Sequence, residues 1–250
     1  MIKNYPKPSG SDAGYRRLSL EDFERAGIRV AERRYGVQEA IFAPGDPDEH
    51  LYFVLSGTVR LSKLYGDYKE ATVALLKDGD LFGELNLQEG SEQRLFAQAL
   101  TEVRVAVIRK RMLVEVLKRD PELVVKLLSS LCERLEQSEE LIDRLLDREV
   151  SARLGKLLQN LSDRFGETDG PATVLDVRLT HQDLANMIAS TREAVSKVMS
   201  EFQRDGLIEV RDRRIAISPR MARSTLGDPP LIPGAADAYG GVTRNVVRVA

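Results

Sequence analysis

The sequence predicts an α+β protein that begins with a β-roll (a small jelly roll), continues as a long coiled-coil helix and ends as a winged helix-turn-helix. Three observations support this order. Residues 29–119 contain short apolar or alternating runs separated by Gly and Asp turns, which is typical of small antiparallel barrels and jelly rolls. Residues 120–147 have a helical pattern with heptad-like apolar spacing. Residues 148–223 end in a strand, two helices and a hairpin, as a winged helix-turn-helix does.

The two ends of the chain differ from these three parts. We expect residues 1–28 to form an N-terminal extension. Residues 224–250 are rich in Gly, Pro and small residues and have no helical period. This composition predicts an extended or disordered tail, although its VVRV run allows an added strand.

The composition is that of a soluble globular protein. The chain has 250 residues, of which 42% are hydrophobic and 30% charged, and its net charge is -2. No run reaches the roughly 18 apolar residues that a membrane helix needs, and the N-terminal residues do not resemble a signal peptide. We therefore expect a cytoplasmic protein with no membrane partner. Residues 151–223 carry a slight excess of basic over acidic side chains, whereas residues 1–150 carry the reverse, so the charge distribution permits a DNA-binding region in the second part.

The few metal-ligating side chains argue against a metal site or a redox cofactor. Cys132 is the one cysteine, so the chain can build neither an intrachain disulfide nor an iron-sulfur cluster. The two histidines, His50 and His181, are far apart in sequence, which disfavours a zinc site. We expect no metal and no covalent cofactor. A haem would need His50 as its axial ligand, and we expect this histidine to lie on an exposed loop.

The β-roll prediction depends on five runs and the turns between them. The runs are residues 39–42, 51–55, 58–65, 71–76 and 103–108, and the turns are residues 44–50, 56–57, 65–67, 77–80 and 88–93. Because strands follow one another closely with short turns, the first part of the chain should be antiparallel.

The long helix should begin at Pro121 behind a capping Asp120 and continue to about Phe165, with a break near Arg148. Apolar residues recur along it at alternating spacings of three and four: Leu128, Leu131, Leu135, Ser138, Ile142 and Leu145. Charged residues leave only this narrow stripe, so we interpret it as the seam of a homodimeric coiled coil. The alternative is a helix buried against its own roll.

The stretch STREAVSKVMSEF, residues 190–202, predicts an amphipathic helix. Its apolar stripe consists of Val195, Val198, Met199 and Phe202, and Glu193, Ser196, Lys197 and Ser200 lie opposite, with Arg192 on the flank. Ser190 stands three residues before Glu193, which is the spacing of a capping box, so the helix should start near Thr191. A strand at 174–179 and a helix at 180–189 precede it, and a hairpin at 205–217 follows.

In a helix-turn-helix the second helix enters the major groove with its N-terminal residues at base edges. Arg192 can bond guanine O6 and N7, and Glu193 can accept from cytosine N4, so a half-site containing G·C pairs is expected. The start of the first helix, with Thr180, His181 and Gln182, is suited to phosphate contacts. The hairpin arginines, Arg211, Arg213 and Arg214, can contribute further backbone contacts.

The sequence resembles the Crp/Fnr family of bacterial transcription factors over about residues 29–218. The resemblance is carried by FGELNL at 82–87, Arg94, the long helix and LTHQDLANMIASTREAVSKVM at 179–199. It implies a cyclic-nucleotide-binding-like roll, palindromic double-stranded DNA as partner, homodimerisation and contact with RNA polymerase. The implied DNA-binding residues are Arg192, Glu193, Ser196, Lys197, Thr180, His181 and Gln182. Lys197 stands where receptor-like members have arginine, so the planar fork is lost there.

The resemblance leaves the effector open between two family subgroups. Members that bind cyclic AMP use a Gly-Glu-Leu turn and an Arg-Ser/Thr-Ala segment. Gly83, Glu84 and Arg94 fit this pattern, but Leu95 replaces the hydroxyl residue. The 2-oxoglutarate-responsive nitrogen-control regulators carry an arginine and, five residues later, a glutamate on the long helix, as at Arg134 and Glu139 here. Against this subgroup, Glu84 and Glu193 replace apolar residues and the loop before Arg94 is one residue shorter.

Both subgroups place the effector at the same residues of the roll and the long helix. The implied effector-binding residues are Phe82, Gly83, Glu84, Leu85, Arg94, Leu95, Arg134, Ser138 and Glu139. A third interpretation is that Glu84, Arg134 and Glu139 form an ion network and that the protein needs no effector.

Two rival functional classes are weaker. An enzyme is disfavoured because the chain has no Walker A, HExxH or GxSxG motif and only two histidines. A ligand-sensing module without DNA binding would leave the polar face of residues 190–202 unexplained. We therefore expect a DNA-binding regulator.

Overall fold

The computed structural model describes residues 18–65, 69–84 and 90–223. The chain divides into two compact units, with the boundary between Asp143 and Arg144. Within the described residues, no helix is long and apolar enough to cross a membrane. The predicted tail at 224–250 lies outside the described residues, as do the first 17 residues of the predicted extension.

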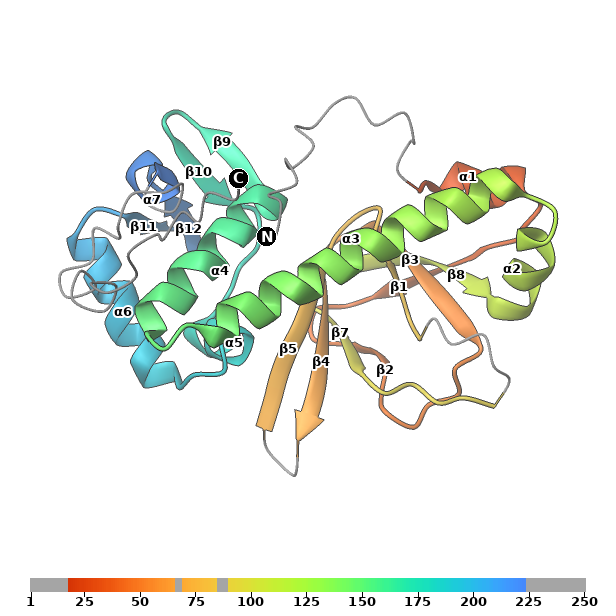
Figure 1. Ribbon diagram of the computed structural model, residues 1–250, viewed down its shortest axis with the longest axis horizontal. Coiled ribbons are helices and arrows are strands. Elements are labelled where there is room, and N and C mark those ends of the chain that lie inside the picture. The colour runs from red at the N-terminus through yellow and green to blue at the C-terminus, as the bar shows by residue number, and fades with distance from the viewer. Residues whose placement is uncertain (1–17, 66–68, 85–89, 224–250) are drawn as a thin grey trace, which may run out of the picture. The chain divides into compact units, whose positions relative to one another are not determined.

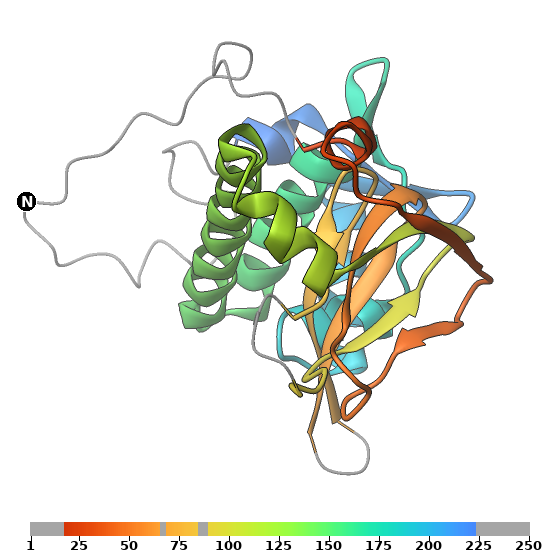
Figure 2. The same ribbon diagram turned by 90° about the vertical axis from the view of Figure 1, so that its right-hand side faces the viewer.

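The first unit contains the predicted β-roll (Figures 1 and 2). Its described strands form two four-stranded antiparallel sheets. One sheet has the order β1 (Ala31–Tyr35), β8 (Val103–Arg109), β3 (His50–Ser56) and β6 (Leu81–Phe82). The other has the order β2 (Ala40–Phe42), β7 (Phe96–Ala99), β4 (Val59–Tyr65) and β5 (Lys69–Leu76). All five predicted runs are strands, whereas β1, β6 and β7 add strands that the sequence pattern did not reveal.

The interior of the roll is apolar. An aromatic cluster lies within it, in which the ring of Phe82 stacks on Tyr52 at a centroid distance of 5.2 Å and lies 6.0 Å from Phe42. Phe82 is fully buried. Leu95 packs against the same core. Burial of the ring raises the pKa of Tyr52.

Two short helices and the start of the long helix cover the outside of the roll. These are α1 (Leu20–Arg25), α2 (Lys110–Leu117) and α3 (Pro121–Leu146), and α1 and α2 face the viewer in Figure 2. Phe23 is fully buried and meets the ring of Phe53 edge-on at 5.7 Å. Residues 18–28, which were expected in the N-terminal extension, therefore belong to the core that α3 covers.

An ion pair also joins α1 to α3. Lys126 Nζ lies 2.6 Å from Asp22 Oδ1, and both side chains are 5% exposed. Burial would raise the pKa of Asp22, but hydrogen bonds from Lys126 and Ser19 outweigh it, so this pKa lies below its ordinary value.

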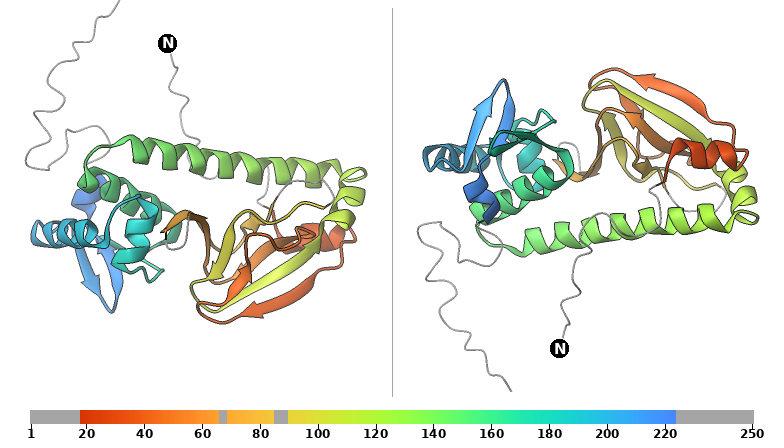
Figure 3. Two further views of the ribbon diagram at one scale, coloured as in Figure 1. Left: turned by 90° about the horizontal axis from the view of Figure 1, so that it is seen from below. Right: turned by 90° about the horizontal axis from the view of Figure 1, so that it is seen from above.

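The long helix begins as predicted and ends close to the predicted break. Asp120 Oδ1 accepts the Leu123 N–H at 3.0 Å, which confirms the predicted cap. The helix stops at Leu146, and α4 (Val150–Phe165) is a separate helix, so the predicted break near Arg148 is confirmed. Figure 3 shows α3 as one continuous helix in both views. Leu123 and Leu127 pack on the roll, whereas the predicted seam is exposed, with 61% of Leu135 and 59% of Ile142 open to solvent.

The second unit is a winged helix-turn-helix. Its sheet has the order β11 (Ile208–Arg211), β12 (Arg214–Ile217), β10 (Ala172–Leu175) and β9 (Gly166–Asp169). Its other helices are α5 (His181–Met187), α6 (Arg192–Arg204) and α7 (Pro219–Arg223).

Two details of this unit correct the sequence prediction. Residues 166–169, where no strand was expected, form β9 because they pair in register with β10. The strand expected at 174–179 instead spans Ala172–Leu175, and the N–H of the next residue, Asp176, bonds the carbonyl of Phe165 at the end of α4.

Candidate nucleic-acid interface and effector site

The helix α6 presents three charged side chains above a buried apolar stripe. Val195, Val198, Met199 and Phe202 are at most 7% exposed, which fixes this face of the helix in the core of the second unit. Arg192 and Glu193 in the first turn, and Lys197 one turn later, are exposed. None of these three forms an ion pair with another described residue. Their donors and acceptors are therefore available to a ligand.

The cap of α6 differs from the prediction by one residue. The side chain of Thr191 accepts the Ala194 N–H at 3.2 Å, so Thr191 and not Ser190 is the N-cap. The Ser190 N–H is bonded to the carbonyl of Ala185 at 3.0 Å. Ser190 thus completes the end of α5, and the first extended residue that can cap α6 is Thr191.

Ser196 links α6 to α5. Its Oγ lies 2.7 Å from Nδ1 of His181, and both residues are half-buried. The structure thus brings together two residues that the sequence assigned to separate DNA contacts. This bond fixes the recognition helix against the first helix of the motif, so Ser196 contributes to the position of α6.

The other two predicted phosphate contacts lie at the start of α5. The Thr180 hydroxyl lies 2.6 Å from Asp183 Oδ2 and accepts the Asp183 N–H at 3.1 Å, which is a capping box. Gln182 is exposed and donates to Asn186 Oδ1 at 2.8 Å. Both side chains therefore have internal partners in the free protein.

The wing of this unit is the hairpin formed by β11 and β12. Its arginines differ in how they are paired. Arg211 Nη2 lies 2.6 Å from Glu209 Oε2, and Arg214 Nη2 lies 3.2 Å from Asp176 Oδ1. Arg213 sits in the turn of the wing with φ +64° and forms no ion pair with another described residue. It lines a surface hollow together with Asp212 and Arg178. Arg178 was not predicted as a DNA contact from the sequence, although it is a cation three residues before the first residue of α5.

In the first unit, Glu84 holds Arg94. Glu84 Oε2 lies 3.0 Å from Arg94 Nη2, and its Oε1 accepts the Arg94 backbone N–H at 3.2 Å. The Glu84 side chain is 13% exposed and that of Arg94 is 82% exposed. Burial would raise the pKa of Glu84, but the hydrogen bonds from Arg94 and the charges of Arg94 and Arg134 outweigh it and hold this pKa below its ordinary value. The carboxylate raises the pKa of Arg94 in turn.

The turn before Glu84 requires glycine. Gly83 has φ +111°, and a Cβ there would lie 3.0 Å from the carbonyl oxygen of His50. His50 belongs to β3 and is half-buried, so the expected exposed loop position was wrong. Burial lowers the pKa of His50. The described residues contain no group of three or more His, Cys, Asp and Glu side chains that could hold a metal.

Arg134 lies between α3 and the roll. It is half-buried and lines a small cavity together with Asp80, Leu81 and Gln137. Burial lowers the pKa of Arg134, and the negative charges of Glu84 and Asp80 oppose this shift. The sequence reading missed Asp80, because the turn pattern KDGD around it gave no sign of a functional role.

The structure brings some of the predicted effector residues together and separates others. Glu84, Arg94 and Arg134 form one charged group, whereas Phe82 and Leu95 belong to the apolar interior of the roll. Ser138 and Glu139 are exposed on α3, and the Ser138 hydroxyl donates to the carbonyl of Arg134 at 3.0 Å. Leu85 lies outside the described residues.

Comparisons with known proteins agree with this arrangement of parts. A family model described as a cyclic nucleotide-binding domain matches residues 32–120, and one described as a Crp-like helix-turn-helix domain matches residues 152–222. A global nitrogen regulator from Nostoc sp. is 34% identical over 72% of this chain and 81% of its own. A CRP-like cAMP-activated global transcriptional regulator from Mycobacterium tuberculosis is 28% identical over 87% of this chain and 92% of its own.

A solved structure has the same fold. The c-di-GMP responsive global regulator CLP from Xanthomonas campestris has a TM-score of 0.68 at 25% identity, over 80% of this chain and 99% of that one. The names of two of these relatives give different effectors, cAMP and c-di-GMP. Similarity alone therefore identifies the kind of protein but not its ligand.

Proposed function

Because the chain belongs to the Crp/Fnr family of DNA-binding transcription regulators, we propose that it reads a palindromic site with α6 and responds to a small anionic effector at Glu84, Arg94 and Arg134. The observation that carries the DNA-binding part is the exposed first turn of α6 above a buried apolar stripe. A helix that is anchored on one face and charged at the start of the other is suited to the major groove.

Each exposed side chain has a defined role in this proposal. The guanidinium of Arg192 donates to guanine O6 and N7, and the carboxylate of Glu193 accepts from cytosine N4. Lys197 supplies a point charge to a base or a phosphate without the planar fork of arginine. Arg213 and Arg178 hold the DNA backbone beside the wing, because neither has an acidic partner among the described residues. RNA polymerase is the further partner that we infer from family membership.

The exposed seam of α3 joins two copies of the chain. Leu128, Leu131, Leu135, Ile142 and Leu145 are 38–61% exposed in the single chain. A helix with such a stripe normally buries it, and identical helices with heptad spacing bury it against each other. Two recognition helices related by the dimer axis would then meet half-sites about 34 Å apart.

For the effector we favour a small dicarboxylic acid such as 2-oxoglutarate. The carboxylate of Glu84 interacts electrostatically with two guanidinium groups, those of Arg94 and Arg134. A ligand with two carboxylates can bind both arginines once it displaces Glu84 from Arg94, whose side chain is accessible to solvent. Leu95, in place of a hydroxyl residue, gives no donor to a cyclic phosphate.

A cyclic nucleotide is the second candidate, because Glu84 favours it. A buried carboxylate can accept hydrogen bonds from ribose hydroxyl groups, whereas it repels a second carboxylate. Calorimetry with 2-oxoglutarate and with cyclic AMP separates the candidates. Binding of 2-oxoglutarate that is lost in Arg94→Ala supports the first, and binding of cyclic AMP alone supports the second. A protein that binds neither and still binds DNA is an effector-independent regulator.

The dimeric DNA-binding mode has its own test. We expect the protein to bind a palindromic duplex with half-sites one helical turn apart. Insertion of about five base pairs between them, half a turn, should weaken binding strongly because the half-sites then face opposite sides of the duplex. Fluorescence anisotropy at fixed salt measures this. Equal affinity for both duplexes would contradict reading by a two-fold dimer.

A further inference from the structure

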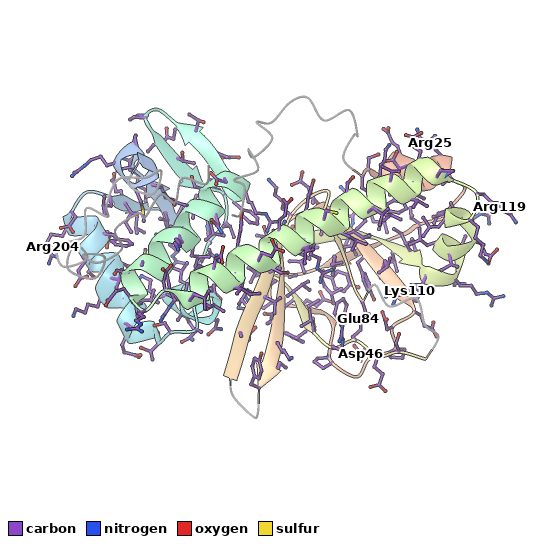
Figure 4. All side chains as sticks on the ribbon, viewed as in Figure 1. Arg25, Asp46, Glu84, Lys110, Arg119 and Arg204 are labelled. Carbon is purple, nitrogen blue, oxygen red and sulfur yellow. The ribbon has the colours of Figure 1, made fainter. Side chains whose placement is uncertain are left out.

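A buried polar cluster lies beside the segment that carries Arg94. The side chain of Asp48 is fully buried, and that of Lys110 is 9% exposed. Asp48 Oδ2 is paired with Lys110 Nζ and accepts the Ser91 hydroxyl at 2.9 Å, and its Oδ1 accepts the Gln93 side-chain amide at 3.0 Å. Figure 4 labels Lys110, together with Asp46 and Glu84. One carboxylate therefore binds the segment 91–93 and the first residue of α2.

The backbone binds the same segment to the same loop. The Asp48 N–H donates to the carbonyl of Ser91 at 3.0 Å, and the Gln93 N–H donates to the carbonyl of Asp46 at 2.9 Å. The Gly45 N–H completes the ladder at the carbonyl of Gln93, also at 2.9 Å. We call residues 45–48 and 91–93 the clamp. The Lys110 N–H donates to the carbonyl of Glu49 at 3.0 Å, so the clamp is fixed to the start of β3 and α2.

The Gln93 side chain is bonded through one of its two polar atoms. Gln93 is 3% exposed, and its Oε1 has no hydrogen-bond partner among the described residues. A buried acceptor without a partner has an unfavourable desolvation free energy. The remaining polar atom, Nε2, is bonded to Asp48. The carboxylate of Asp48 therefore orients this amide and, together with the backbone bonds of the clamp, fixes the position of Gln93.

We propose that Asp48 is a positioning residue for the effector site, which acts through the clamp on Arg94. This rests on the proposed function of Arg94. Arg94 follows Gln93 directly in the chain, and its own N–H donates to Glu84. A shift of the backbone at Gln93 therefore moves both contacts between Arg94 and Glu84. The carboxylate of Asp48 touches no effector in this proposal.

The test compares Asp48→Asn with Asp22→Asn. Both changes neutralise a buried carboxylate that pairs with a lysine in the same unit, but Asp22 lies on α1 and its side-chain partners, Ser19, Arg25 and Lys126, are not residues of the clamp. Hydrogen exchange of the full-length dimer without ligand should become at least tenfold faster at the Gln93 and Arg94 amides in Asp48→Asn. The same amides should keep their wild-type rates in Asp22→Asn, although both variants lose stability. Unchanged exchange in Asp48→Asn, or an equal increase in both variants, would overturn the clamp.

Ligand binding is the second readout and separates the two proposals. With 2-oxoglutarate and cyclic AMP as probes, Asp48→Asn should weaken binding of the active probe about tenfold, and Asp22→Asn should leave it unchanged. Equal weakening in both variants assigns the effect to general stability and overturns the positioning role. If neither probe binds the wild type, or if Arg94→Ala binds as the wild type does, the proposed effector site fails. The exchange rates then still decide whether the clamp exists.

Discussion

The substitution Leu135→Ala should weaken the dimer strongly without unfolding either unit. Leu135 lies at the centre of the exposed stripe on α3 and is 61% exposed in the single chain. Full burial of a leucine side chain contributes about 1.5–3 kcal/mol. Since 61% of the residue remains to be buried in the dimer, its contribution is about 1–2 kcal/mol per protomer.

The symmetry of the dimer doubles this contribution. Two copies of Leu135 lose about 2–4 kcal/mol together, which raises the dimer dissociation constant by about 30-fold to 700-fold. Sedimentation equilibrium over a range of protein concentrations measures this constant directly. The control is Glu136→Ala, the next residue on the same helix, which is exposed and lies off the stripe. We expect it to change the constant less than threefold.

Two results would refute this reasoning. If the dimer dissociation constant of Leu135→Ala equals that of the wild type, the exposed stripe is not the dimer interface. If Glu136→Ala weakens the dimer as much as Leu135→Ala does, the interface lies on a different face of α3. Thermal unfolding of both variants should remain close to wild type at high protein concentration, because the side chain of Leu135 makes little contact within its own protomer.

Two further predictions concern the wing and the ion pair of α1. Arg213→Ala should reduce the slope of log DNA affinity against log salt concentration by about 0.9 per protomer. Arg211→Ala should change this slope less, because the Arg211 cation is already paired with Glu209. Equal slopes for both variants would contradict a phosphate contact that is specific to Arg213. Asp22→Asn should lower the free energy of unfolding by about 2 kcal/mol at neutral pH, because the side chain is 5% exposed and paired. The folded-state pKa of Asp22 lies below its ordinary value of 3.8. The stabilisation by the Asp22 carboxylate is therefore present above pH 3.8 and lost as the pH falls through the folded-state pKa. The unfolding free energies of the wild type and Asp22→Asn, measured by denaturant titration, should therefore converge below about pH 3.8. A difference between them that does not change with pH would contradict the assignment.

The parts of the fold with a strong local pattern could be predicted from the sequence. The long runs of the roll alternate or are continuously apolar, and the start of α3 carries an Asp cap directly before a proline. In contrast, the strand β1 has the sequence AERRY and is largely exposed, so its strand conformation depends on pairing with β8. No local pattern shows such a strand.

The contacts of the site depended on tertiary structure. The sequence placed Ser196 on the polar face of α6, but its bond to His181 depends on the angle between two helices. The pairing of Glu84 with Arg94 joins residues ten positions apart in the chain. Ser190 has the spacing of a capping box, but its N–H bonds the carbonyl of Ala185 at the end of α5, so it does not cap α6. Residue types were therefore predictable, whereas their partners were not.

A base-substitution scan tests whether Arg192 reads a specific base pair. Fluorescence anisotropy compares the wild type, Arg192→Ala and Arg204→Ala on palindromic duplexes that differ at one base pair in each half-site. Arg204 is an exposed arginine at the other end of α6 and serves as the control. The wild type and Arg204→Ala should discriminate by about 1–3 kcal/mol at one G·C pair, and Arg192→Ala should lose discrimination at that pair alone. Retention of full discrimination in Arg192→Ala would contradict the account.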